Sequence, residues 1–276
     1  MKNKILLVLI FFILTGFANA QSSLLCSIFV VAHGLEKMSD ETLTKLNAFR
    51  WNYQDEIINA AKNLAPILNE KINACGSKPV IIKAHGYGMS VVYHILGIGK
   101  RYVEMFPEHA YVKIYKKVTG VYSIAGAFRG TPLMDRICTN TSDRSIAQVL
   151  GKKCIFSMTT APIHHPSYDV NSPGVPVYLI SSTFRGDENS NRVKMLGSYG
   201  LTWEEYFIHD DRNQSDGVIP LFSALGCEFI EPMLYKDSDC EKINEIYFKN
   251  YNRNDFVGHY DLLMEKNLID GVYDEK

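Results

Sequence analysis

The sequence predicts a parallel α/β fold. Four segments are apolar and rich in β-branched residues: 27–32, 79–84, 118–124 and 175–180. They lack the polar–apolar alternation of half-exposed strands, which is typical of strands buried on both faces of a parallel sheet. Helical patterns separate the first three segments, so strand and helix alternate along the chain.

Two helices are expected between the first three strands. The first has apolar residues at helical spacing, and Pro66 is expected to kink it. Its apolar residues are Ile57, Ile58, Ala61, Leu64, Leu68 and Ile72. Residues 91–106 predict the second helix. Residues 131–174 and 183–215 are rich in polar residues, and we interpret both as loops and lid-like insertions over one edge of the sheet.

Length and composition exclude several classes of protein. The chain has 276 residues, of which 46% are hydrophobic and 21% charged, and its net charge is −1. This length can bury a sizeable core, and the ordinary charge content argues against disorder. A near-neutral chain without a basic stripe is not expected to bind nucleic acid. No internal repeat of about 20–50 residues indicates a solenoid or propeller.

The first twenty residues predict a secretory signal peptide. Lys2 and Lys4 precede an apolar run over residues 5–14, and the small-residue exit Ala18-Asn19-Ala20 follows. The run is shorter than the roughly 20 residues of a membrane span, so an anchor is the less favoured interpretation. We expect cleavage after Ala20, a single domain over residues 21–276, and a secreted or periplasmic location without a transmembrane segment.

The cysteines fit an exported protein. All six follow residue 20, and they allow many pairings that sequence alone cannot choose among. Spacing suggests local loops closed by Cys138 with Cys154 and by Cys227 with Cys240. Cys26 and Cys75 each precede a predicted strand, and adjacent parallel strands would bring these two together.

Three segments carry residues that are typical of catalysis. Residues 30–35 end the first strand with His-Gly, and residues 82–89 end the second strand with His-Gly-Tyr-Gly. Residues 215–220 (SDGVIP) come much later and precede His259. The order of these segments along the chain matters more than any one of them, because each alone is a weak signal.

Together these segments resemble the α/β-hydrolases, and among them the secreted bacterial triacylglycerol lipases and related ester or thioester hydrolases. That family has a strand ending in His-Gly, an elbow G-H-S-x-G, an Asp-Gly segment and a late histidine. Residues 127–132 (AFRGTP) resemble the loop that these lipases carry after the strand beyond the elbow. The resemblance spans most of residues 27–265. It implies an α/β-hydrolase fold, with a mostly parallel central sheet, helices on both faces and lid-like insertions.

One position departs from the family pattern. Gly86 stands where the nucleophilic serine belongs, and Ala84 replaces the first glycine of the elbow. Glycine has no side chain and cannot form an acyl-enzyme. The elbow residue is held at positive φ, which glycine adopts with little steric cost. We therefore expect an intact fold that lacks the nucleophile.

The resemblance implies roles for the remaining parts of the site. Asp216 would orient His259, which would act as general base and then as general acid. The backbone N–H groups of Leu35 and Tyr87 would form the oxyanion hole.

Further residues are expected around the substrate. His33, Gly34 and His85 are assigned to the substrate-binding side, although pure packing is an equally simple role for His33. His85 is also expected to be a structural member of the elbow. Gly34 and Gly88 would let the backbone approach closely.

Three functions remain open on the sequence. The first is a disarmed hydrolase that keeps a pocket for an acyl-ester or lipid-like small molecule and could bind a protein partner. The second is an active lipase, esterase or thioesterase, in which Gly86 is a variant or Ser90, one helical turn further on, is the nucleophile. The third is a structural or adhesive domain, which the ordered motifs disfavour.

No cofactor or metal is expected. His164 and His165 lack a third ligand at a recognisable spacing, and a solvated loop is the simpler interpretation. Asp237 and Asp239 suggest calcium, but a full ligand loop is not visible in the sequence. His94, on the helix after the elbow, is interpreted as a packing residue.

Overall fold

The computed structural model describes residues 25–32, 39–45, 47–139, 154–160, 174–182, 219, 221–224, 229–230, 234–235 and 245–248. Its centre is a five-stranded sheet in which all neighbouring strands are parallel. In spatial order the strands are β1 (Cys26–Val31), β2 (Val80–His85), β3 (Val118–Ile124), β4 (Val177–Ser182) and β7 (Glu245–Phe248). The first four match the predicted strands to within two residues, so the predicted parallel α/β fold is confirmed.

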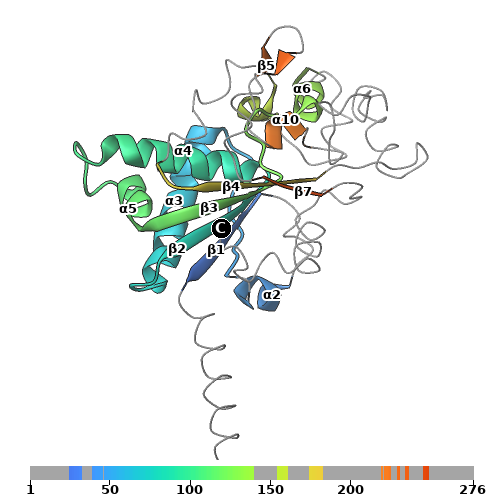
Figure 1. Cartoon of the computed structure of the whole chain (residues 1–276). Coiled ribbons are helices and arrows are strands. Elements are labelled where there is room, and N and C mark those ends of the chain that lie inside the picture. Colours follow the sequence, from blue (N-terminus) through green and yellow to red (C-terminus); the bar gives the residue numbers. More distant parts are fainter. Residues whose placement is uncertain are drawn as a thin grey trace, which may run out of the picture.

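Three helices cover one face of the sheet, and a fourth lies near the edge strand β1 (Figure 1). The covering helices are α3 (Ile57–Ala74), α4 (Tyr87–Tyr102) and α5 (Ala110–Lys117), and the fourth is α2 (Asp40–Lys45). The apolar residues of α3, α4 and α5 pack on Ile28, Val30 and Ile82 of the sheet to form the main core. These helices and the parallel sheet form the α/β arrangement that the sequence predicted.

The carboxyl ends of the parallel strands meet at one edge of the sheet. Beyond this edge lie α6 (Pro132–Thr139), α10 (Leu221–Ala224) and the short strand β5 (Phe229–Ile230), as Figure 1 shows. Strand β5 pairs with β6 (Leu234–Tyr235) in a separate antiparallel hairpin. Segments far apart in the sequence thus gather where α/β proteins usually bind their ligands.

The helix predictions need correction in detail. Ile57, Leu64 and Leu68 of α3 are buried as expected, but Ile58 is 56% exposed because it faces away from the sheet. Pro66 lies inside α3. Helix α4 begins at Tyr87, four residues before its predicted start, because Gly86 turns the chain directly from β2 into the helix.

Helix α5 was not predicted. Its short apolar face of Tyr111, Val112 and Ile114 is buried against the core, and α4 approaches it closely at Gly99. A Cβ atom on Gly99 would lie 2.4 Å from the Tyr111 carbonyl oxygen. Such a close approach of two helices needs a residue without a side chain.

Residues 131–139, predicted to be irregular, are largely helical, because α6 buries Leu133, Met134 and Ile137. The disulfide Cys138–Cys154 joins α6 to the 3₁₀-helix η2 (Phe156–Met158), with the two Cα atoms 4.9 Å apart. We call these elements, residues 132–139 and 154–160, the insertion.

A second disulfide, Cys26–Cys75, ties the start of β1 to the end of α3, with the Cα atoms 5.8 Å apart. Two of the three suggested cysteine pairs are therefore confirmed. The third pair, Cys227 and Cys240, lies outside the described residues.

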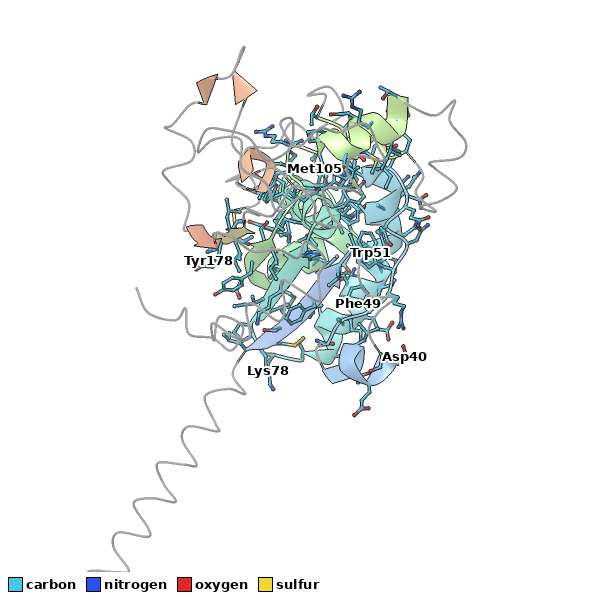
Figure 2. The ribbon with its side chains drawn as sticks, turned by 90° about the vertical axis from the view of Figure 1, so that its right-hand side faces the viewer. Asp40, Phe49, Trp51, Lys78, Met105 and Tyr178 are labelled. Carbon is cyan, nitrogen blue, oxygen red and sulfur yellow. A yellow bond between two sulfur atoms is a disulfide. The ribbon has the colours of Figure 1, made fainter. Side chains whose placement is uncertain are left out.

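The outer edge of β1 is covered by the segment that follows α2. Ala48 forms a single parallel bridge to Phe29, and the Trp51 indole N–H donates to the Val31 carbonyl oxygen at 2.7 Å. Figure 2 shows Trp51 within the body and Asp40 at the surface.

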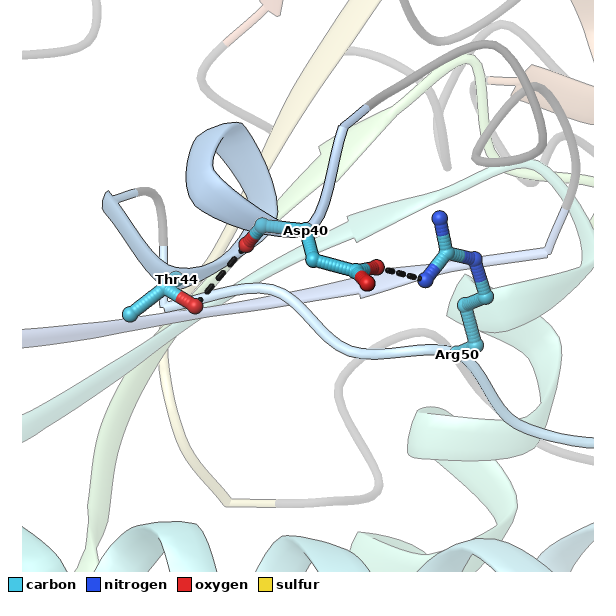
Figure 3. A network of polar contacts seen from close by, with 3 residues as sticks. All are labelled: Asp40, Thr44 and Arg50. Atoms are coloured by element: carbon cyan, nitrogen blue, oxygen red, sulfur yellow. Dashed lines mark hydrogen bonds and ion pairs between the residues drawn. The ribbon is translucent and has the colours of Figure 1, made fainter.

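Asp40 makes two polar contacts, one to Arg50 in the segment that follows α2 and one within α2, as Figure 3 shows. The Asp40 carboxylate pairs with Arg50, and the Thr44 hydroxyl donates to the Asp40 carbonyl oxygen at 2.8 Å. The Asp40 side chain is 87% exposed. This ion pair is therefore expected to contribute less than about 1 kcal/mol.

His94 on α4 predicts a pH-dependent stability. Burial and the nearby Arg101 guanidinium lower the pKa of His94 from 6.5 to about 4. Between these pH values the unfolded chain binds the extra proton, so acid favours unfolding. His94 should leave stability unchanged above about pH 6.5 and remove about 3 kcal/mol as the pH falls to about 4. Urea unfolding should show a flatter pH dependence for His94→Gln, and an identical slope in both proteins would contradict this account.

None of the helices within the described ranges is both long and apolar enough to cross a membrane.

Candidate functional site

The candidate site is centred on a sharp turn at the carboxyl end of β2. Gly86 connects His85, the last residue of β2, to Tyr87, the first residue of α4. Its backbone has φ 56° and ψ −131°. Side-chain-bearing residues rarely adopt these angles, whereas glycine does so readily. The turn therefore connects strand β2 directly to helix α4, as in the elbow that the sequence suggested.

Backbone hydrogen bonds fix both peptide groups of Gly86. The Gly86 N–H donates to the Ile124 carbonyl oxygen at 3.0 Å, and the Gly86 carbonyl accepts from Ala127 N–H at 3.2 Å. Both partners belong to the end of β3 and the loop that follows it. The turn is thus held by its neighbours and needs no side chain of its own.

Gly88 lets the start of α4 approach β1. A Cβ atom on Gly88 would lie 2.8 Å from the carbonyl oxygen of Val30. Real Cβ atoms essentially never approach an atom that closely. The expected close approach at Gly88 is therefore confirmed. The corresponding expectation for Gly34 lies outside the described residues.

Ser90, the alternative nucleophile, is engaged elsewhere. Its side chain is buried, and its hydroxyl donates to the Ala127 carbonyl oxygen at 2.7 Å. This bond braces the loop after β3 against α4. The hydroxyl is thus committed to a backbone acceptor, which argues against a role as nucleophile.

The loop after β3 also meets the segment that follows Asp216. Ala127 packs with Ile219 and Ala224 in a small buried cluster. Arg129 N–H donates to the buried Ser223 hydroxyl at 2.9 Å. Ile219, Ser223 and Ala224 are therefore held beside the loop that holds Gly86.

The Tyr87 side chain ties the start of α4 to the insertion. Its hydroxyl lies 2.9 Å from the Ser157 hydroxyl and donates to the Asp55 carbonyl oxygen at 3.1 Å. Burial raises the pKa of Tyr87 well above its usual value, and the nearby Glu56 and Asp55 carboxylates act in the same direction. The Tyr87 hydroxyl therefore stays protonated and can donate a hydrogen bond at any physiological pH.

Glu56 fastens the insertion to the start of α3. Its two carboxylate oxygens accept from Phe156 N–H at 2.8 Å and from Ser157 N–H at 3.0 Å. The Ser157 hydroxyl donates to the same carboxylate at 2.9 Å and accepts from Ile57 N–H at 3.1 Å. A carboxylate that receives two backbone N–H groups at the start of a short helix is a strong cap.

The residues of this network were not predicted from the sequence. Glu56 and Ser157 are 101 residues apart in the chain, and Tyr87 and Ser157 are 70 apart. No local pattern marks such pairs. The only available signal was the Cys138–Cys154 spacing, which indicated a compact loop in this region.

Of the predicted site residues, the structure describes Gly86, Tyr87 and His85. His85 is fully buried at the end of β2, where Val31 and Ile124 are its neighbours in the sheet. The other site residues, His33, Gly34, Leu35, Asp216 and His259, lie outside the described residues.

In the part of the chain that the structure describes, no group of three or more histidine, cysteine, aspartate or glutamate side chains could hold a metal ion. The paired histidines at 164–165 and the acidic residues at 237–239 are outside that part.

Several solved structures are similar to this chain. The mature lipase BlEst2 of Bacillus licheniformis is 13% identical, with a TM-score of 0.49 over 88% of this chain and 90% of that one. A metagenomic carboxyl esterase, MGS0156, is 16% identical, with a TM-score of 0.45 over 88% and 76%. The phospholipase PlaB of Legionella pneumophila is 11% identical, with a TM-score of 0.43 over 74% and 46%.

No protein-family model matches the sequence, and no curated protein matches it either. Identities and TM-scores this low transfer no activity to the chain. The fold assignment rests instead on the strand order and on the turn at Gly86.

Proposed function

We propose that this protein is a disarmed ester hydrolase of the lipase type, exported from the cytoplasm, which keeps a pocket for an acyl ligand. One observation carries the proposal. Gly86 occupies a turn from strand to helix at φ 56° and ψ −131°, where a hydrolase of this fold carries its nucleophile. A site with a glycine there has no atom that could form the acyl-enzyme.

Contacts around the turn support roles for the acid and the histidine. Ile219 packs on Ala127, whose N–H bonds to Gly86, and Asp216 precedes Ile219 by three residues. Three residues of chain span at most about 11 Å, so this spacing is compatible with the proposed role of Asp216. His259 follows β7, whose carboxyl end lies at the same edge of the sheet as that of β2.

Export agrees with the two disulfides, because such bonds form in oxidising compartments. The apolar start of the chain is proposed to be the signal that directs it there.

The proposal is tested on the natural protein with p-nitrophenyl esters of increasing acyl length and with the matching fatty acids. We expect no turnover above the uncatalysed rate, together with calorimetric binding of the fatty acids that depends on chain length. The control is Ser90→Ala, which should change neither result. Ester turnover by the natural protein that is lost in Ser90→Ala would overturn the proposal and favour an active hydrolase.

A further inference from the structure

The turn between α4 and α5, residues 103–109, carries an exposed apolar tip. Met105 is 63% exposed and Phe106 is 53% exposed. Across the described residues only four large hydrophobic side chains are this exposed, and two of them are neighbours here. A single exposed apolar residue is ordinary on a protein surface, whereas an adjacent pair in a connecting turn calls for an explanation.

The local structure holds this tip in place. Phe106 N–H donates to the Tyr102 carbonyl oxygen at 2.8 Å, and His109 N–H donates to the Phe106 carbonyl oxygen at 2.9 Å. The Phe106 ring meets the Tyr102 ring edge-on, with the ring centroids 5.1 Å apart. The apolar side chains are therefore presented by an ordered turn.

Basic residues lie on the two helices that flank the tip. Exposed lysines and an arginine lie in the last turn of α4 and along α5: Lys100, Arg101, Lys113, Lys116 and Lys117. The acidic residues of the turn are Glu104 and Glu108. Glu108 pairs with Lys113 at 2.9 Å, and the Lys113 and Lys116 ammonium groups lower the pKa of its carboxyl. Over residues 100–117, five basic and two acidic residues give a net charge of +3.

We propose that the α4–α5 turn docks the protein on an anionic lipid surface. Met105 and Phe106 would enter the headgroup region while the basic residues meet anionic phosphates. The positive charge selects this partner, since an apolar tip alone would fit many surfaces.

The location of the tip separates this activity from the candidate site. Helix α4 begins directly after Gly86 and has 16 residues, so it carries the turn about 24 Å away from the elbow. The turn is therefore a point of attachment remote from the acyl site, and docking should not depend on the residue at position 86.

The test uses tryptophan as a local probe on the full chain. Phe106→Trp is compared with Ile58→Trp, which replaces an equally exposed apolar residue on α3. Vesicles of phosphatidylglycerol mixed with brominated phosphatidylcholine should quench the tryptophan at 106 and leave the one at 58 unchanged. Any membrane contact made by the N-terminal apolar run is common to both variants and cancels in the comparison.

Two further results are expected. The double variant Met105→Ser/Phe106→Ser should bind phosphatidylglycerol vesicles about tenfold less tightly or worse. Binding should weaken between about 0.1 M and 1 M salt, where the Debye length falls from about 10 Å to about 3 Å. Equal quenching at both probe positions, no quenching at 106, or undiminished binding by the double variant would overturn the proposal.

Discussion

Replacing Gly86 by serine is expected to give an ester hydrolase at least about 10³-fold more active than the natural protein. The substitution supplies the one group that the proposed site lacks. The turn that would present the hydroxyl is already fixed, because Ile124 and Ala127 bind both peptide groups of Gly86. The measurement is the rate of p-nitrophenyl ester hydrolysis by both proteins over a series of acyl lengths.

The same substitution should cost stability. At φ 56° and ψ −131° a residue with a Cβ atom is strained by about 1–3 kcal/mol. Gly86→Ala is the matched control, because it carries the strain without the hydroxyl. Equal loss of stability in both variants, with activity confined to the serine variant, is the expected pattern. Equal activity in Gly86→Ala and Gly86→Ser would contradict the assignment of this position.

Replacing Gly130 by alanine is expected to destabilise the protein by about 3 kcal/mol or more. Gly130 has φ +72°, and an added Cβ atom would lie 2.1 Å from the Thr159 carbonyl oxygen. The nearest atoms belong to the backbone of Met158 and Thr159 in the insertion. The steric clash can therefore be relieved only if the insertion moves away from the loop after β3.

The variant Gly76→Ala separates the cost of backbone strain from the cost of a steric clash. Gly76 has a similar φ of +66°, but an added Cβ atom would meet nothing within 4 Å. Its substitution should therefore cost only the backbone strain, about 1 kcal/mol. Urea unfolding of both variants measures the difference. If Gly130→Ala and Gly76→Ala lower the free energy of unfolding equally, the contact between Gly130 and the insertion does not limit stability.

The strands and the turn at Gly86 were predictable because their signals are local. Unbroken β-branched runs mark buried parallel strands, and a glycine directly after such a run marks a turn that other residues avoid. The pairing of Cys26 with Cys75 followed from the same pattern, because both precede strands that proved to be neighbours. The start of α4 was misplaced because residues 86–90 carry two glycines, which resemble a loop in the sequence.

The hydrogen-bond network between the insertion and the elbow could not be predicted in the same way. Glu56, Tyr87 and Ser157 come from three separate segments, and none of them stands out in composition. Their meeting depends on how α3, α4 and the insertion pack, which only the tertiary structure determines. The bond between Arg129 and Ser223 is of the same kind, with 94 residues between its partners.

Position 86 is, on this proposal, the empty nucleophile position of a hydrolase. The most direct test is labelling by a fluorophosphonate probe, followed by intact-mass and peptide analysis of the natural protein and Gly86→Ser. We predict one probe per molecule in Gly86→Ser, attached to the serine introduced at position 86, and no label on the natural protein. Stoichiometric labelling of the natural protein at any residue, Ser90 included, would contradict the claim.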